Sequence, residues 1–221
     1  MDVISEEPEA PSRPWNHNVA YHGVVRRAVP SGGRDLLDVG CGRGRLARRL
    51  ALADPRRHVL GLDPSGEMID AARAEHADVP GLEFVEGDFL TCEIPPGSYD
   101  FVCFVASLHH MDQVRALTKA AEILRPGGRL VVIGLARAAT LPEELVNIAL
   151  APVVWFNDLR PDFYEAWGVP IADPALGWHE TAKLTRTALP HAHFRRRLYF
   201  RYSLRWTKPG DVSASAEALG E

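Results

Sequence analysis

Short apolar runs alternate with helix-patterned segments through the first two thirds of the chain, and this alternation constrains the fold more than any other feature. The runs have the length and apolar content of buried strands and lie at 35–39, 58–62, 82–85, 99–105 and 129–135. The helical patterns between them lie at 44–52, 66–76 and 113–124. This order predicts an α/β fold in which helices cover a mainly parallel sheet.

The segments outside this alternation predict how the rest of the chain is organised. Residues 1–13 are acidic and lack apolar periodicity, which indicates a disordered leader, and 208–221 is expected to be a loose tail. The stretch 140–174 is rich in aromatic residues and proline, so we expect a helical insertion or lid there. One helix and two closing strands are expected after it, at 179–189, 194–199 and 202–207. The chain is therefore expected to form one domain from 14 to 207.

Composition and charge exclude several classes of protein. The net charge of −4 is unlike the basic balance of a general nucleic-acid binder. No apolar run reaches the length of a membrane span, and the N-terminus lacks the charged-then-apolar order of a signal peptide. The three cysteines, Cys41, Cys92 and Cys103, have no CxxC spacing, so neither a disulfide framework nor a zinc site is expected. We expect a cytoplasmic protein that binds neither nucleic acid nor a membrane; the sequence does not specify its oligomeric state.

The sequence LLDVGCGRGRL contains a glycine-rich turn between a strand and a helix. The strand ends near Asp38, and the turn carries Gly40, Gly42 and Gly44. Glycines let the backbone turn sharply and approach a ligand, and the N-terminus of the next helix presents unpaired N–H groups. The third glycine of a nicotinamide-binding GxGxxG loop would fall at Arg45, which disfavours a nicotinamide oxidoreductase. Asp38 would also repel a pyrophosphate, so a cationic or amine-bearing ligand fits better.

Acidic residues also end the next two expected strands. Asp63 follows the second strand, at the position where an acid grips both ribose hydroxyls of a bound nucleotide. Asp88 follows the third strand, where it could accept a hydrogen bond from an adenine amine. The alternative is that both residues only cap turns and helices. Together with Asp38, however, three successive strand ends offer an acid, which favours a ligand site at this edge of the sheet.

These residues together resemble the class I S-adenosylmethionine-dependent methyltransferases. The resemblance rests on LLDVGCGRGRL, GLDPS, EGDFL, YDFVCFVASLHHM and LRPGGRLVVIG, in family order over residues 36–135. It implies a Rossmann-like sheet of seven strands in the order 3-2-1-4-5-7-6, with strand 7 antiparallel. It also implies S-adenosylmethionine as cofactor and S-adenosylhomocysteine as product, without a metal.

The resemblance also implies which residues hold the cofactor. The set is Asp38, Gly40, Cys41, Gly42, Gly44, Asp63, Pro64, Met68, Asp88, Phe89 and Val105. Asp38 would lie near the amino group, and Asp63 would hold the ribose hydroxyls. Asp88 and the Phe89 backbone would read the adenine edge.

Absent motifs narrow the acceptor to a small molecule. The chain reads VASLHHM where amino-methyltransferases of nucleic acids have (Asp/Asn)-Pro-Pro-(Tyr/Phe), and the glutamate pair of protein-arginine enzymes is missing. Trp155, Phe156 and Trp167 in the expected insertion suit a flat, apolar substrate, although such residues can also simply pack the insertion onto the core. The chain further resembles small bacterial enzymes of secondary metabolism, some of which methylate carbon 3 of indole in cyclic dipeptides. This implies an aromatic or indole-containing natural product as acceptor.

The segment WNHNVAYH near the N-terminus is the candidate acceptor side of the site. On a helix, His17, Asn18, Tyr21 and His22 would share one face. We expect Tyr21 and His22, with His110 after the fourth strand, to be catalytic residues that deprotonate the acceptor, and His17 to contact the substrate. The alternative for each residue is a structural role. The gap between His17 and His22 places them on different helical faces, so a metal site is not expected.

Two functions remain open from the sequence. The first is methyl transfer by in-line attack with base-assisted deprotonation. The second is a non-catalytic module that binds S-adenosylmethionine or S-adenosylhomocysteine for regulation or partner docking.

Overall fold

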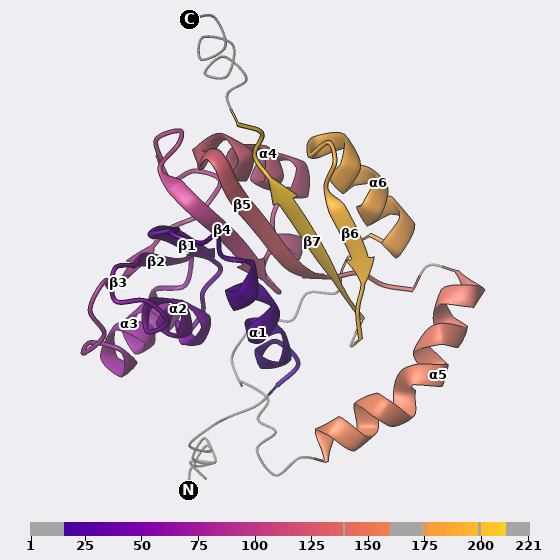
Figure 1. Ribbon diagram of the computed structural model, residues 1–221. Helices are drawn as coiled ribbons and strands as arrows, with labels where there is room; N and C mark the ends of the chain where they lie inside the picture. Colours follow the sequence, from indigo (N-terminus) through magenta and orange to yellow (C-terminus); the bar gives the residue numbers. More distant parts are fainter. Residues whose placement is uncertain (1–15, 139, 160–173, 175, 199, 211–221) are drawn as a thin grey trace, which may run out of the picture.

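The structure, a computed structural model, describes residues 16–138, 140–159, 174, 176–198 and 200–210 (Figure 1). The expected leader, 1–13, and all of the expected tail beyond residue 210 lie outside the described residues. None of the described helices is long and apolar enough to cross a membrane.

The strands of the described residues form one sheet. They are β1 (Asp35–Val39), β2 (His58–Asp63), β3 (Leu82–Glu86), β4 (Tyr99–Val105), β5 (Leu124–Leu135), β6 (His193–Arg196) and β7 (Arg201–Thr207). Their order is β3-β2-β1-β4-β5-β7-β6. Neighbours from β3 to β5 pair in parallel, and β7 is antiparallel to β5 and β6. The predicted order and the antiparallel seventh strand are confirmed.

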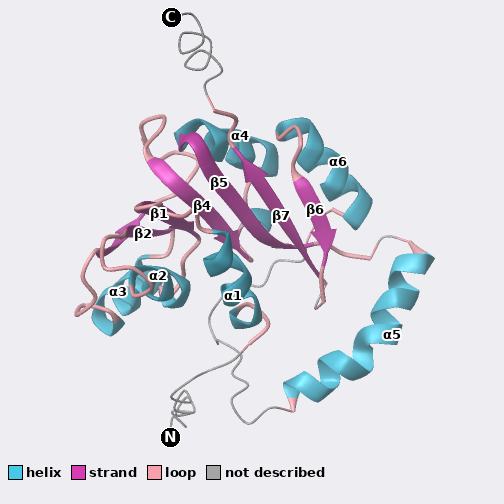
Figure 2. Cartoon of the chain, in the orientation of Figure 1, coloured by secondary structure: helices cyan, strands magenta, loops and turns pink. Residues whose placement is uncertain are grey.

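Helices cover both faces of this sheet (Figure 2). The described helices are α1 (Val19–Ala28), α2 (Arg45–Ala51), α3 (Gly66–Glu75), α4 (Gln113–Ile123), α5 (Leu141–Asp158) and α6 (Trp178–Ala188), with a 3-10 turn η1 (Leu108–His110); all except α5 pack on the sheet. One apolar cluster joins the sheet to α1, α2 and α3, and a second joins its other face to α4 and α6. The predicted α/β layering is thus present.

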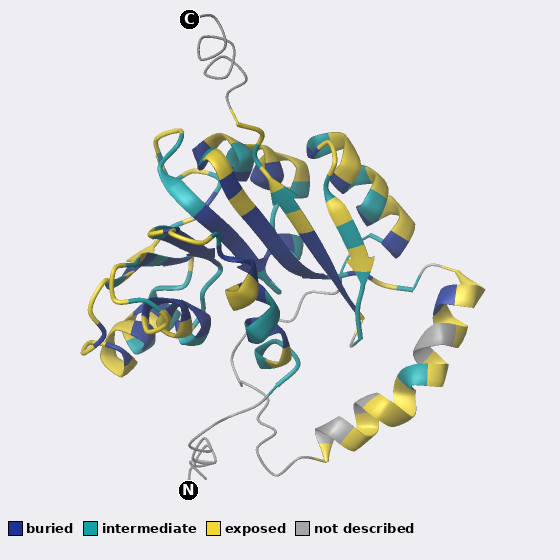
Figure 3. Cartoon of the chain, in the orientation of Figure 1, coloured by how far each residue is buried: buried dark blue, intermediate teal, exposed yellow. Residues whose placement is uncertain are grey.

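The central strands are buried on both faces, as Figure 3 shows for β4 and β5. Phe101, Val102, Cys103 and Phe104 of β4 are all 0% exposed. Parallel strands with helices on both sides need such continuous apolar runs, which is why the runs are visible in the sequence. The strand β5 starts earlier than the strand expected at 129–135, because Leu124 pairs with Tyr99 ahead of the Pro-Gly-Gly segment.

The expected insertion contains the helix α5, which stands apart from the sheet in Figure 1. Its first turn is tied to β6, because Nη2 of Arg196 donates a hydrogen bond to the carbonyl oxygen of Glu143 at 3.0 Å. Beyond that turn the helix exposes large apolar side chains, including Trp155 at 65% and Phe156 at 72%. The expected helix is therefore present, and its action as a lid stays a prediction.

The contact between β5 and β7 yields a test of the packing. A Cβ atom added at Gly134 would lie 2.3 Å from Cζ of Tyr202, a side chain that is 1% exposed and stacked on Phe194. We expect Gly134→Ala to lower the free energy of unfolding by about 1–3 kcal/mol in urea denaturation, because the overpacked ring must shift.

A control glycine and a compensating change check that explanation. Gly210→Ala should have little effect, since its Cβ would meet nothing within 4 Å. Adding Tyr202→Leu to Gly134→Ala should cost less than the sum of the two single changes. Additive costs would contradict the proposed clash.

Candidate functional site

A cavity of about 430 Å³ opens where strands β1, β2 and β4 end and α1 begins. This is the edge at which open parallel sheets bind ligands, because the strand order reverses between β1 and β4. The lining residues are Asn16, Asn18, Val19, His22, Asp38, Gly40, Cys41, Gly42, Arg43, Arg45, Leu46, Asp63, Pro64, Ser65, Glu67, Met68, Val105, Ala106, Ser107, His110 and Met111.

The glycines of the turn after β1 have distinct roles. Gly40 has a φ of 70°, and a Cβ there would lie 2.3 Å from Cβ of Ser107 in the loop after β4. Gly42 has a φ of 51° and open space where a Cβ would be, so its backbone is accessible from the cavity that it lines. Gly44 does not line the cavity; a Cβ there would collide with the ring of Phe84. Gly44 thus allows close packing against Phe84, and its contact with the cofactor stays a prediction.

Asp38 is a buried carboxylate in the wall of the cavity. It is 2% exposed, and its Oδ1 accepts a hydrogen bond from Sγ of Cys103 at 3.4 Å. Burial raises the pKa of Asp38 to about 7, with a further contribution from Asp63, against the opposing effect of the Cys103 hydrogen bond. No Lys or Arg of the described chain pairs with it. A cationic ligand group would provide the missing partner.

Asp63 connects the turn after β1 to the end of β2. Its Oδ2 accepts a hydrogen bond from the backbone N–H of Gly42 at 2.8 Å, and its Oδ1 accepts one from Ser65 at 3.0 Å. Each carboxylate oxygen has a second lone pair, so Asp63 can still accept hydrogen bonds from a ligand. Eight predicted cofactor residues line the cavity: Asp38, Gly40, Cys41, Gly42, Asp63, Pro64, Met68 and Val105.

Asp88 and Phe89, predicted to read the adenine edge, are not among the residues that line this cavity. The carboxylate of Asp88 folds back on its own loop and accepts a hydrogen bond from the N–H of Leu90 at 2.7 Å. The side chain of Phe89 is 2% exposed and packs edge-on against Phe104 in the core. Asp88 therefore caps its own turn, and the predicted contacts of Asp88 and of the Phe89 backbone with the adenine stay predictions.

The segment before α1 is a turn rather than part of the helix. Oδ1 of Asn16 accepts hydrogen bonds from the N–H groups of Asn18 and Val19, both at 3.0 Å, and the helix begins at Val19. The prediction of one helical face for His17, Asn18, Tyr21 and His22 is therefore wrong. Asn18 and His22 line the cavity, and His17 does not.

Tyr21 does not line the cavity either. Its side chain is 8% exposed, and its hydroxyl donates a hydrogen bond to the carbonyl oxygen of Leu198 at 2.9 Å. Adjacent helical residues point about 100° apart, and here His22 faces the cavity while Tyr21 points toward Leu198. This geometry ties α1 to the connection between β6 and β7 and does not support the predicted catalytic role of Tyr21.

His22 is buried and uncharged at neutral pH. Burial, followed by the positive charges of Arg49 and Arg45, lowers the pKa of His22 to about 3. Nη1 of Arg49 lies 3.3 Å from its Nδ1. Because a guanidinium only donates, Nδ1 is the acceptor, and neutral His22 carries its proton on Nε2. In this tautomer His22 donates a hydrogen bond and is not a general base.

His110 is the other histidine of the cavity, and it follows β4 in η1. Its ring lies 4.0 Å from the ring of His109, centroid to centroid. His109 does not line the cavity, and burial, followed by the charges of His110 and Arg201, lowers the pKa of His109 to about 4. His110 therefore remains a catalytic candidate at the cavity.

Two predicted substrate residues of the insertion do not line the cavity. Trp155 and Phe156 lie exposed on α5, and Trp167 falls outside the described residues. Their contact with a substrate stays a prediction.

Several cavity residues were missed by sequence reasoning, although they lie beside predicted ones. These are Asn16, Val19, Arg43, Arg45, Leu46, Ser65, Glu67, Ser107 and Met111. They lie within or beside the recognised motifs, including the first residues of α2 and α3, or at the start of α1. Considering the whole neighbourhood of each motif would have found most of them.

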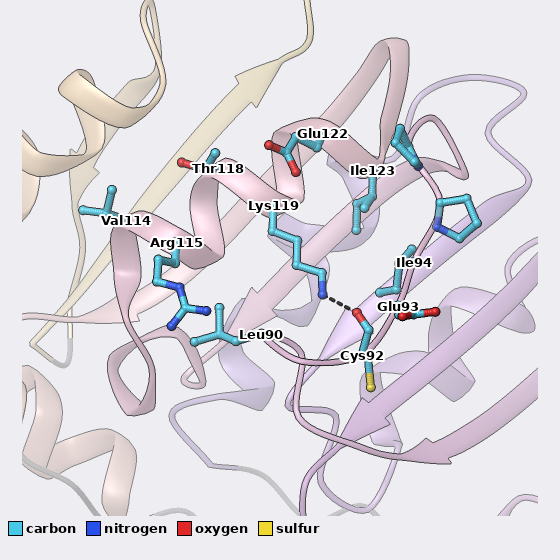
Figure 4. A pocket seen from close by; sticks show the side chains of 12 residues that line it. Leu90, Cys92, Glu93, Ile94, Val114, Arg115, Thr118, Lys119, Glu122 and Ile123 are labelled. Atoms are coloured by element: carbon cyan, nitrogen blue, oxygen red, sulfur yellow. Dashed lines mark hydrogen bonds between the residues drawn. The ribbon is translucent and has the colours of Figure 1, made fainter.

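A second, more open hollow of about 800 Å³ lies between α4 and the loop after β3 (Figure 4). Lys119 reaches across it and donates a hydrogen bond to the carbonyl oxygen of Cys92. None of the predicted site residues lines this hollow. In the described part of the chain, no group of three or more His, Cys, Asp or Glu side chains is arranged to hold a metal ion.

Comparison with known proteins agrees with this geometry. Residues 36–128 match the family model of a methyltransferase domain. An uncharacterized methyltransferase of Mycobacterium tuberculosis (strain ATCC 25618 / H37Rv) is 32% identical over 199 residues, which cover 89% of this chain and 98% of that protein. A fatty-acid O-methyltransferase of Mycolicibacterium smegmatis is 34% identical over 144 residues, or 65% of this chain and 52% of that protein.

A solved structure has the same fold. The S-adenosylmethionine-dependent methyltransferase of Methanosarcina mazei superposes with a TM-score of 0.60 at 15% identity, covering 85% of this chain and 98% of that chain. The matched family model, the relative aligned over nearly its whole length and the shared sheet order lead to one conclusion. The chain belongs to the class I S-adenosylmethionine-dependent methyltransferases.

Proposed function

We propose that the chain transfers a methyl group from S-adenosylmethionine to a small molecule with an aromatic or indole-containing body. The observation that carries this proposal is one cavity lined both by the unpaired carboxylate of Asp38 and by His22 and His110 from two different elements. The carboxylate suits a cationic cofactor, and the histidines suit an acceptor that must be oriented and deprotonated.

The residues around the cavity fit the cofactor. When bound, S-adenosylmethionine supplies a methyl group that is already activated by its sulfonium sulfur. Asp38 would hold the ammonium group, Asp63 the ribose hydroxyls, and Pro64 and Met68 would lie beside the adenine. The missing side chain of Gly42 leaves room for close approach, and about 430 Å³ is an ordinary size for a small-molecule site.

His22 and His110 have different proposed roles toward the acceptor. His22, protonated on Nε2 by virtue of its contact with Arg49, would donate a hydrogen bond that orients a bound molecule. His110 would accept the proton from a weakly acidic N–H or O–H of the acceptor. Tyr21 has no direct part, because its hydroxyl is bound to Leu198.

The first test of this function combines binding with turnover. S-adenosylhomocysteine should bind in calorimetry, and a mass-spectrometric screen with S-adenosylmethionine should yield an acceptor that has gained one methyl group. His110→Gln should lower kcat by about 100-fold while changing cofactor affinity little, since general-base catalysis contributes about 10²–10⁴-fold. His193→Gln, at an exposed position on β6, is the matched control.

Two outcomes would contradict the proposal in different ways. Binding without transfer to any acceptor would favour a non-catalytic module that senses the cofactor or its product. Absence of binding at high micromolar ligand would remove the cofactor site itself.

Asp63 and Asp88 provide a matched pair of variants for the cofactor site. Asp63→Ala should weaken binding of S-adenosylhomocysteine by about 10–100-fold, because lost hydrogen bonds to a charged group are worth about 1.5–3 kcal/mol. Asp88→Ala should weaken it less than threefold, since that carboxylate binds its own loop. Calorimetry measures both affinities. Equal losses of affinity in the two variants would indicate that Asp88 also contacts the cofactor.

The pKa of Asp38 predicts a pH dependence of cofactor binding. The unliganded carboxyl has a pKa of about 7, and a bound ammonium group favours its charged form, so binding releases a proton below that pH. Between about pH 5.5 and 7, affinity should therefore rise with pH by up to about tenfold per unit and then level off. Calorimetry in buffers of different ionisation enthalpy counts the released protons. Asp38→Asn should flatten the profile, and a flat wild-type profile would contradict this role.

A further inference from the structure

Arg201, the first residue of β7, is a buried cation without a partner in the described part of the chain. It is 6% exposed, and its Nε and Nη1 atoms are buried without a hydrogen-bond partner. No carboxylate of the described residues forms an ion pair with it. Burial lowers the pKa of Arg201 to about 10, so the guanidinium is still charged at neutral pH.

Arg201 lies at the same edge of the sheet as the cofactor cavity. It pairs with Leu135 at the end of β5, and β7 runs antiparallel, so its first residue meets the edge where the parallel strands end. Electrostatic contacts place it near Tyr21 of α1 and His109 of η1. These two residues directly precede His22 and His110, which line the cavity. Arg201 thus lies just behind the acceptor side of the site.

His109 adds a second unpaired polar group to this place. Its Nδ1 is buried and has no hydrogen-bond partner in the described chain. Leaving a buried polar atom unpaired is unfavourable, and leaving a buried charge unpaired is more so. Two such groups that interact electrostatically would both be satisfied by one ligand that pairs with them.

We propose that Arg201, together with His109, binds a carboxylate of the methyl acceptor, so that the substrate is an acidic molecule with an apolar or aromatic body. This inference rests on the proposed methyl transfer and specifies its substrate class. The guanidinium presents planar pairs of N–H donors that match a carboxylate, and a lysine would not provide them. His109 donates an additional hydrogen bond from its unpaired nitrogen.

The charge balance selects a carboxylate over a phosphate group. Arg201 contributes one positive charge, and the lowered pKa of His109 leaves that ring neutral when the site is empty. One positive charge neutralises one carboxylate, whereas a doubly charged phosphate monoester would keep an uncompensated negative charge. The carboxylate serves as an anchor, and the atom that accepts the methyl group lies elsewhere on the molecule.

The test compares acids with their amides on the protein loaded with S-adenosylhomocysteine. The probes are indole-3-acetate against indole-3-acetamide, and octanoate against octanamide, measured by calorimetry. Wild type should bind at least one acid about tenfold more tightly than its amide. Arg201→Met should reduce this preference to less than about threefold without changing affinity for the amide, and Arg201→Lys should retain part of it.

A stability measurement separates substrate binding from a structural role. If no group of the chain pairs with Arg201, then Arg201→Met should keep or raise Tm, because an unpaired buried charge is exchanged for an apolar side chain of similar length. A lowered Tm would show that the chain itself supplies the partner and would overturn the proposal. It would also be overturned if neither acid is preferred by wild type, or if the preference survives in Arg201→Met.

Failure of this inference differs from failure of the proposed function. Loading with S-adenosylhomocysteine is measured first, and its absence would contradict the cofactor site. Normal loading without preference for an acid would contradict only the carboxylate anchor.

Discussion

The close approach of Gly40 to Ser107 is the contact on which the site depends. A side chain at Gly40 would occupy the position of the Ser107 side chain, and the Ser107 hydroxyl donates a hydrogen bond to the carbonyl oxygen of Val39. The loops after β1 and β4 are thereby held together where the strand order reverses. That reversal opens the crevice, and the contact between Gly40 and Ser107 fixes two of the loops that line it. Asp38 and Asp63 then reach the same space from neighbouring strands.

Two buried charges of opposite sign distinguish this edge from the rest of the core. Asp38 and Arg201 are 2% and 6% exposed, and neither has an ion-pair partner among the described residues. Each destabilises the unliganded fold, because burial disfavours the charged form. Unpaired buried charges of this kind are typical of functional sites, where a bound ligand supplies the opposite charge. A cationic cofactor and an acidic acceptor would pair with Asp38 and Arg201 respectively and recover stability on binding.

The sequence predicted the sheet better than the side chains around it. Strand order and the turn after β1 were predictable because buried strands need apolar runs and the turn needs glycines at positive φ, and both leave local patterns. The role of Asp88 is not predictable in the same way, because an acid after a strand looks the same whether it binds a ligand or caps its own loop. Arg201 could not be identified as a site residue from the sequence, because its unpaired guanidinium and the lack of an ion-pair partner among the described residues become apparent only in the folded chain.

Neighbouring residues of helix α1 that were both predicted to be catalytic lie in two different surroundings. Tyr21 and His22 point about 100° apart, so one binds Leu198 near Arg201 while the other lines the cavity. His109 and His110 divide in the same way after β4, His109 toward Arg201 and His110 toward the cavity. Helix α1 and the turn η1 therefore lie between the cavity and the guanidinium of Arg201, and we call them the partition. An acceptor anchored at Arg201 would have to extend past this partition to reach the cofactor, which favours a molecule whose acid group and reacting atom are separated by an apolar body.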